Sequence, residues 1–79
     1  MFFVYRLQSV EHPEEKYTGF TRDVPQRLLA HNNGQVPHTL KYKPWKLINS
    51  FAFADEKKAK EFEAYLKSGS GRAFAQKHF

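Results

Sequence analysis

The sequence predicts an α+β domain in which a three-stranded, mostly antiparallel sheet is flanked by helices, in the order β-β-α-β-α-α. Three observations support this fold class. Aromatic and β-branched residues dominate three short segments, each typical of a strand. An aspartate precedes each of two longer helical segments, where it is a good N-cap. The chain has 79 residues, which are enough for one core, so we expect a single domain over residues 1–79.

The first two strands are expected to form a hairpin. The first, residues 2–9, directs Tyr5 to one face of the sheet together with its neighbours at a spacing of two. The polar segment 10–15 contains a proline and predicts the turn. The second strand, residues 17–21, begins with Tyr17, so the two phenols are expected on neighbouring strands.

A capped helix follows the hairpin. Asp23 predicts its N-cap, with Gln26 at the spacing of a capping box, and Gly34 predicts its end. Arg27 and His31 are four residues apart, so they lie on the same helix face. A guanidinium and an imidazole beside a tyrosine-bearing strand are suited to an anionic ligand. An ordinary solvated helix face is the alternative interpretation.

Residues 45–53 predict the third strand. The side chains expected on its core-facing side are Trp45, Leu47, Phe51 and Phe53, with an asparagine interrupting the row. A proline-containing segment, expected to be a loop, and a short stretch that alternates basic with aromatic residues precede this strand.

The last third of the chain predicts two helices. The first runs from Glu56 to about Ser68, residues 68–71 break it, and a short terminal helix covers residues 72–79. Glu63 falls within the apolar stripe of the first of these helices, where a buried carboxylate is costly unless it is paired or binds a metal. An ion pair with Lys67 at i+4 is one interpretation. A Mg²⁺ site is the other, because this ion needs few protein ligands when a substrate phosphate supplies oxygens.

The charge of the chain is unevenly distributed. The net charge is +5, and the basic excess lies entirely after residue 40. A basic surface favours polyanions through the release of counterions. The chain has no cysteine, which excludes disulfides and thiolate metal sites. No apolar run approaches the roughly 20 residues of a membrane span and no signal peptide pattern is present, so we expect a soluble cytoplasmic protein.

These residues together resemble the GIY-YIG nuclease superfamily. Phe3-Val4-Tyr5 corresponds to the first motif of that family and Tyr17-Thr18-Gly19 to the second. Arg27 and His31 match the helix that follows the motifs, and Glu63 matches the metal-binding glutamate. Five positions in the right order make the resemblance specific, although each three-residue motif alone is weak.

The resemblance covers nearly the whole chain and is strongest to small single-domain endonucleases related to the nuclease domain of the excision-repair endonuclease. Phe3 stands where the family has its first glycine, and Thr18 stands where it usually has isoleucine. Neither position is expected to act chemically, so both substitutions should mainly affect packing.

The resemblance implies a Mg²⁺- or Mn²⁺-dependent endonuclease that hydrolyses DNA phosphodiester bonds, in DNA repair or recombination. Glu63 would bind the metal ion. Tyr5 or Tyr17 would deprotonate the attacking water, and Arg27 would neutralise the phosphate as charge builds up on it. His31 would orient or activate a tyrosine.

The expected partner is DNA, bound by a monomer through its backbone with little reading of sequence. The residues expected to contact the backbone are Lys41, Lys43, Lys46, Lys67 and Arg72. Tyr42 and Trp45 either stack on a base or belong to the core. The alternative function is a non-catalytic nucleic-acid-binding module that retains the fold.

Overall fold

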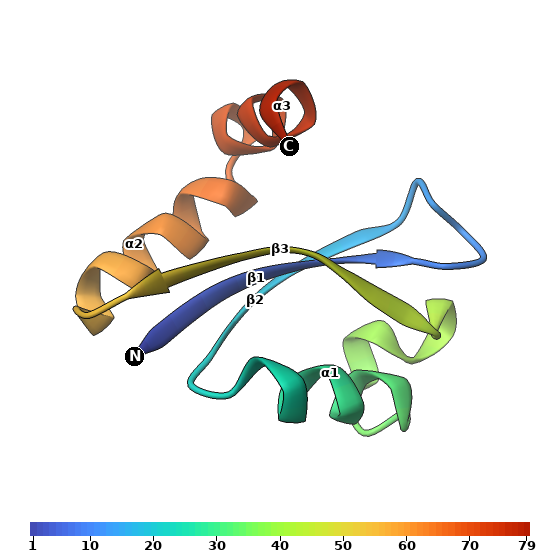
Figure 1. Ribbon diagram of the computed structural model, residues 1–79. Coiled ribbons are helices and arrows are strands. Elements are labelled where there is room, and N and C mark those ends of the chain that lie inside the picture. Colours follow the sequence, from blue (N-terminus) through green and yellow to red (C-terminus); the bar gives the residue numbers. More distant parts are fainter.

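A three-stranded antiparallel sheet with strand order β2-β1-β3 forms the centre of the structure (Figure 1). The computed structural model describes all 79 residues. The elements in chain order are β1 (Phe2–Ser9), β2 (Lys16–Thr21), α1 (Val24–Asn32), a 3₁₀ helix η1 (Pro37–Tyr42), β3 (Trp45–Phe53), α2 (Glu56–Lys67) and α3 (Gly69–His78). The predicted fold class and element order are therefore confirmed. None of the helices combines the length and the apolar character needed to cross a membrane.

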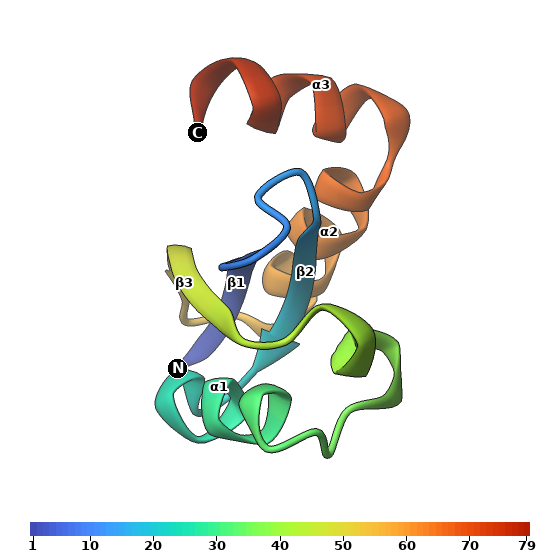
Figure 2. The same cartoon turned by 90° about the vertical axis from the view of Figure 1, so that its right-hand side faces the viewer.

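Both faces of the central strand β1 are covered by helices. Val4 packs on one face with Ala59 and Leu66 of α2 and with Ala75 of α3. On the other face, Tyr5 and its neighbours pack beneath α1. Figure 1 shows α1 on the opposite side of the sheet from α2 and α3, and Figure 2 shows β1 between β2 and β3. Because both faces of β1 are covered, four consecutive residues of this strand, Val4 to Leu7, are buried.

A register shift in β3 corrects the prediction that its apolar residues share one face. Leu7 pairs with Leu47, whereas Arg6 pairs with Asn49, so β3 carries one extra residue at this point. An extra residue reverses the sides to which the following side chains point. Trp45 consequently packs beside Leu7 on the α1 side. The phenylalanines of β3 pack on the other side, with Val4 and α2.

The helix boundaries follow local capping interactions. The Asp23 carboxylate accepts a hydrogen bond from the backbone N–H of Gln26 at 3.1 Å, and Gly34 ends α1 with a φ of 75°. The expected four-residue break after α2 is a single residue, Ser68. Its backbone N–H donates to the carbonyl of Tyr65 at 3.0 Å, and its hydroxyl accepts from the N–H of Gly71 at 3.1 Å. One serine therefore ends α2 and begins α3.

The early start of α3 and the turn of η1 both differ from the sequence prediction. Helix α3 begins at Gly69, three residues before the expected Arg72, because the Ser68 cap outweighs the low helix propensity of glycine. The 3₁₀ helix η1 covers Pro37–Tyr42, whereas the sequence predicts a loop over residues 35–40. Its proline occupies the first turn, where no N–H needs a helical partner.

The two glycines of α3 provide a matched test of this turn. A Cβ at Gly71 would overlap the backbone carbonyl of Tyr65, whereas a Cβ at Gly69 would meet no atom within 4 Å. Gly71→Ala should therefore lower the free energy of unfolding by about 1–3 kcal/mol. Gly69→Ala should be neutral or stabilising by at most about 1 kcal/mol, because alanine favours a helix. Denaturant unfolding measures the free energy of unfolding of both variants. An equal change in the two would contradict the close approach of α2 and α3.

Candidate active site

A buried hydrogen bond joins the hairpin to α1. The hydroxyl of Tyr5 lies 2.8 Å from Nε2 of His31, and the two residues are 1% and 0% exposed. The ring of Tyr17 lies against the same imidazole, with the ring centroids 5.0 Å apart. The two tyrosine rings are 6.3 Å apart. The structure thus brings both expected phenols and the expected histidine into one cluster.

The second nitrogen of His31 binds a residue that no sequence pattern singles out. His31 Nδ1 lies 2.7 Å from Oγ1 of Thr39, and this hydroxyl donates to the carbonyl of Val36 at 3.3 Å. A hydroxyl has one proton, so Thr39 must accept from Nδ1–H, and Nε2 is then free to accept the proton of Tyr5. The network fixes one neutral tautomer of His31. No motif marks Thr39, because its role depends on η1 folding against α1.

Burial is the main cause of the shifted pKa values of Tyr5 and His31. Desolvation, together with the nearby charge of Arg27, lowers the pKa of His31 to about 4. Desolvation also raises the pKa of Tyr5 to about 12, although the neighbouring guanidinium of Arg27 acts to lower it. The net pKa of Tyr5 is raised, because desolvation outweighs the effect of Arg27. Both members of the pair are neutral at pH 7.

Arg27 and Tyr17 form the accessible edge of the cluster. Both are half-buried, in contrast to Tyr5 and His31. Arg27 forms no salt bridge, so its charge is available to an anion. A phosphate group placed at this edge would meet a cation and a phenol hydroxyl, while the buried pair behind them holds the strand and the helix in place.

Glu63 approaches the cluster from α2. The Oε2 of Glu63 lies 3.0 Å from Nζ of Lys67, and the Glu63 side chain is 20% exposed. The same Nζ lies 6.0 Å from the ring centroid of Tyr17. The ion pair considered for Glu63 is thus formed. No group of three or more His, Cys, Asp or Glu side chains is arranged to bind a metal, so Glu63 fits only an ion that takes one carboxylate and completes its shell with water and phosphate oxygens.

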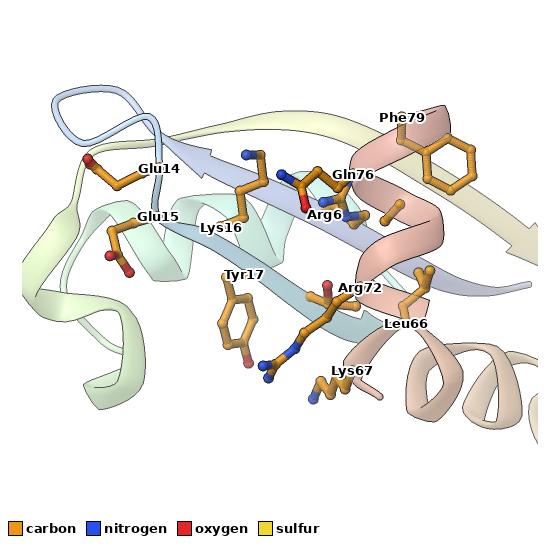
Figure 3. Close-up of a pocket in the computed structure, with 12 residues that line it drawn as sticks. Arg6, Glu14, Glu15, Lys16, Tyr17, Leu66, Lys67, Arg72, Gln76 and Phe79 are labelled. Atoms are coloured by element: carbon orange, nitrogen blue, oxygen red, sulfur yellow. The ribbon is translucent and has the colours of Figure 1, made fainter. Parts of the chain in front are cut away.

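The residues expected to contact DNA fall into separate places. Lys67 and Arg72 line a pocket together with Tyr17 (Figure 3). Lys41 lies in η1, and Lys43 follows it. Lys46 lies on β3 opposite Gln8. Lys67 and Arg72 thus line the pocket, whereas Lys41, Lys43 and Lys46 are not among its lining residues.

The two aromatic candidates for base stacking differ in accessibility. Trp45 is buried, and its indole N–H donates to the carbonyl of Thr39 at 2.9 Å, so it belongs to the core. Its backbone is held by the Asn32 side chain, which donates to the Trp45 carbonyl at 3.0 Å. Tyr42 is half-buried against His12, with ring centroids 5.1 Å apart.

Comparisons with known proteins agree with the motifs. Residues 1–77 match the model of the GIY-YIG catalytic domain. The UPF0213 protein SAG0778 of Streptococcus agalactiae is 40% identical over 58 residues, which are 72% of this chain and 66% of that protein. The UPF0213 protein CPE1444 of Clostridium perfringens is 35% identical over 68 residues, which are 85% of this chain and 71% of that protein. This chain thus spans about two thirds of the length of the streptococcal relative.

A solved structure shows the same fold. The solution NMR structure of the UPF0213 protein BH0048 from Bacillus halodurans superposes with a TM-score of 0.57. The sequences are 31% identical, and the match covers 96% of this chain and 81% of that chain.

The lowered pKa of His31 predicts a specific loss of stability in acid. The unfolded chain binds a proton near the ordinary pKa of 6.5, whereas the folded protein does so only near 4. The contribution of neutral His31 to the free energy of unfolding is therefore fully present above pH 6.5 and is lost as the pH falls towards 4. Between pH 7 and 4.5 the wild type should lose roughly 2–3 kcal/mol of unfolding free energy through this residue.

Denaturant unfolding at the two pH values tests this prediction with two variants. His31→Gln should remove this part of the pH dependence, whatever its effect on stability at pH 7. His38→Gln, at an exposed position, should keep it. Equal pH dependence in the wild type and His31→Gln would show that the imidazole is not held in its neutral form.

Proposed function

Because this chain belongs to the GIY-YIG nuclease family, we propose that it is an endonuclease that hydrolyses phosphodiester bonds of DNA with the aid of a divalent metal ion. The observation that carries the proposal is the convergence of the hairpin, α1 and α2 on Tyr17. His31 of α1, one helical turn after Arg27, lies with its ring centroid 5.0 Å from that of Tyr17. Lys67 of α2, the ion-pair partner of Glu63, has its Nζ 6.0 Å from the same tyrosine ring. Groups of these types at one edge are suited to the hydrolysis of a phosphate ester.

The accessible edge of the cluster would meet the substrate. Arg27 would bind the scissile phosphate through parallel hydrogen bonds and stabilise the charge that develops on it. Tyr17 would contact the attacking water and deprotonate it as the general base. Between the two tyrosines, exposure favours Tyr17 for this role.

The buried pair would act as positioning groups. Tyr5 and His31 have no access to solvent, and their neutral hydrogen bond fixes α1 against the hairpin. This contact sets the position of Arg27, one helical turn before His31. Thr39 in turn fixes the imidazole.

Glu63 would hold the metal ion. A divalent ion bound there supplies a Lewis acid for an oxygen of the scissile phosphate. Glu63 would have to leave its ion pair with Lys67 to bind such an ion. Lys67 would then be free to contact the nucleic-acid backbone.

The Glu63–Lys67 ion pair also favours a second candidate function. The 3.0 Å contact supplies the carboxylate with a cation from the protein itself. A module that binds nucleic acid without cleaving it would need no metal at this position. The two functions differ in whether Mg²⁺ converts binding into cleavage.

Arg27 and Glu63 provide the test of catalysis. Nicked, branched, single-stranded and duplex DNA would be incubated with the protein, with and without Mg²⁺. On the substrate that is cleaved, Arg27→Ala should lower the rate about 10²–10³-fold, the usual effect of losing a donor to developing charge. Glu63→Gln should abolish the effect of Mg²⁺. Arg22→Ala, at an exposed arginine near the start of α1, serves as the control.

Two outcomes would decide against this assignment. A wild-type rate in the folded Arg27 variant would remove Arg27 from the mechanism. Binding of DNA by the wild type without cleavage of any substrate in Mg²⁺ would leave the non-catalytic module as the function.

The lysines outside the pocket predict an electrostatic contribution to DNA binding. Lys43→Gln with Lys46→Gln should make the slope of log affinity against log salt shallower by at most about two, because each phosphate contact contributes about −0.9. The loss should be similar on two unrelated duplexes, since backbone contacts read no sequence. Lys57→Gln with Lys58→Gln, on the exposed first turn of α2, is the matched control. An unchanged slope in the first variant would remove both lysines from the interface.

A further inference from the structure

A pocket of about 650 Å³ lies between the hairpin and α3 (Figure 3). Four cationic side chains line it: Arg6, Lys16, Lys67 and Arg72. The acidic residues in the lining are Glu14 and Glu15, at the hairpin end of the pocket, and neither forms a salt bridge with these cations. The pocket therefore has an excess of positive charge.

Arg6 makes this pocket unusual. It lies in the middle of the central strand, between the core residues Tyr5 and Leu7, and is only 7% exposed. A buried charge without a partner is costly, and Arg6 has no salt bridge. Its one side-chain hydrogen bond runs from Nη1 to Oδ1 of Asn49 at 2.9 Å. Burial also lowers the pKa of Arg6, as expected for a cation without a counter-charge.

The remaining donors of Arg6 are directed to the pocket. A guanidinium carries five N–H groups, and the bond to Asn49 accounts for only part of them. No buried side-chain nitrogen or oxygen in the protein lacks a hydrogen-bond partner, so the unbonded nitrogens of Arg6 retain access to solvent. Since Arg6 lines the pocket, this access is through the pocket. The site thus offers planar, paired donors to an anion.

The other cations complete a binding surface that reaches the candidate active site. Figure 3 shows the side chains of Arg6 and Lys16 near Gln76, and that of Arg72 extending towards Tyr17 and Lys67. Tyr17 belongs to both places, because it lines the pocket and also contacts His31. An anion in the pocket would lie beside the proposed hydrolytic edge.

We propose that the pocket binds a phosphodiester group of the nucleic acid that is next to the scissile phosphodiester. Arg6 is the main residue that binds this group. The inference rests on the proposed function for the choice of nucleic acid over another phosphate ester. Arginine binds phosphate through two parallel hydrogen bonds, a geometry that lysine does not offer. The volume exceeds the need of a single inorganic ion, and Tyr17 and Phe79 give the pocket aromatic walls next to its cations.

Binding of a dinucleotide tests this site without metal and without cleavage. The probes are thymidylyl-thymidine, which has one phosphodiester, thymidine, which has none, and inorganic phosphate. In an NMR titration, the dinucleotide should shift the amide signals of Lys16, Arg72 and Gln76, and thymidine should leave them in place. Phosphate alone should bind more weakly at the same residues, which separates a nucleotide site from a free-phosphate site.

The variant Arg6→Met, with Arg22→Met as its matched control, measures the contribution of Arg6 to dinucleotide affinity. Arg6→Met should weaken dinucleotide binding about tenfold or more, the usual effect of losing a charged hydrogen-bonding partner. Its melting temperature should be unchanged or raised, because an unpaired buried charge is replaced by an apolar side chain of similar length. Arg22→Met should bind as the wild type does. If Arg6→Met fails to fold, Arg72→Gln, at an exposed position, replaces it and should weaken binding in the same way.

The outcomes separate this inference from the proposed nuclease activity. Unchanged dinucleotide affinity in the folded Arg6 or Arg72 variant would overturn the proposal that the pocket binds a phosphodiester. Shifts confined to residues around Arg27 would also overturn it, while leaving the nuclease proposal intact. Binding at the pocket by a protein that cleaves no DNA would support the pocket and contradict the nuclease.

Discussion

The hydrogen bond between the Tyr5 hydroxyl and Nε2 of His31 is the constraint on which the candidate site depends. It crosses from the central strand to α1, and both partners are excluded from water. The Thr39 hydroxyl donates to the carbonyl of Val36, so it accepts the proton of His31 Nδ1 and leaves Nε2 to accept from Tyr5. Trp45 then fixes the backbone of Thr39 through its indole N–H. Hydrogen bonds thus hold four elements, β1, α1, η1 and β3, in position relative to one another, and each of these polar groups has a hydrogen-bond partner.

This arrangement separates the support of the site from its reactive edge. Uncharged, buried groups hold the hairpin against α1, and the charges lie at the periphery, on Arg27 and on the Glu63–Lys67 pair. A phenol with a pKa near 12 beside an imidazole with a pKa near 4 does not exchange its proton readily. The chemistry that we propose therefore takes place on the exposed side of Tyr17, and the cationic pocket extends that side towards α3.

Local patterns predicted the fold, whereas packing between distant segments determined most of what the prediction missed. Capping aspartates and aromatic strands have a local cause, so the element order is confirmed. The extra residue in β3 has no local signature and appears only when Arg6 pairs with Asn49. Thr39 and Arg6 were not identified as site residues, because the burial of each depends on an element far along the chain. The motifs did predict the cluster of Tyr5, Tyr17, Arg27, His31 and Glu63, whose roles stay predictions.

The ¹⁵N chemical shifts of the His31 ring nitrogens at pH 7 test the central constraint most directly. A long-range ¹H–¹⁵N correlation spectrum distinguishes the two neutral tautomers from the imidazolium. The hydrogen-bond network predicts a proton on Nδ1 and an unprotonated Nε2 that accepts from Tyr5. Loss of Tyr5 in a Tyr5→Phe variant should shift Nε2 and leave Nδ1 protonated. An imidazolium, or a proton on Nε2 in the wild type, would contradict this account.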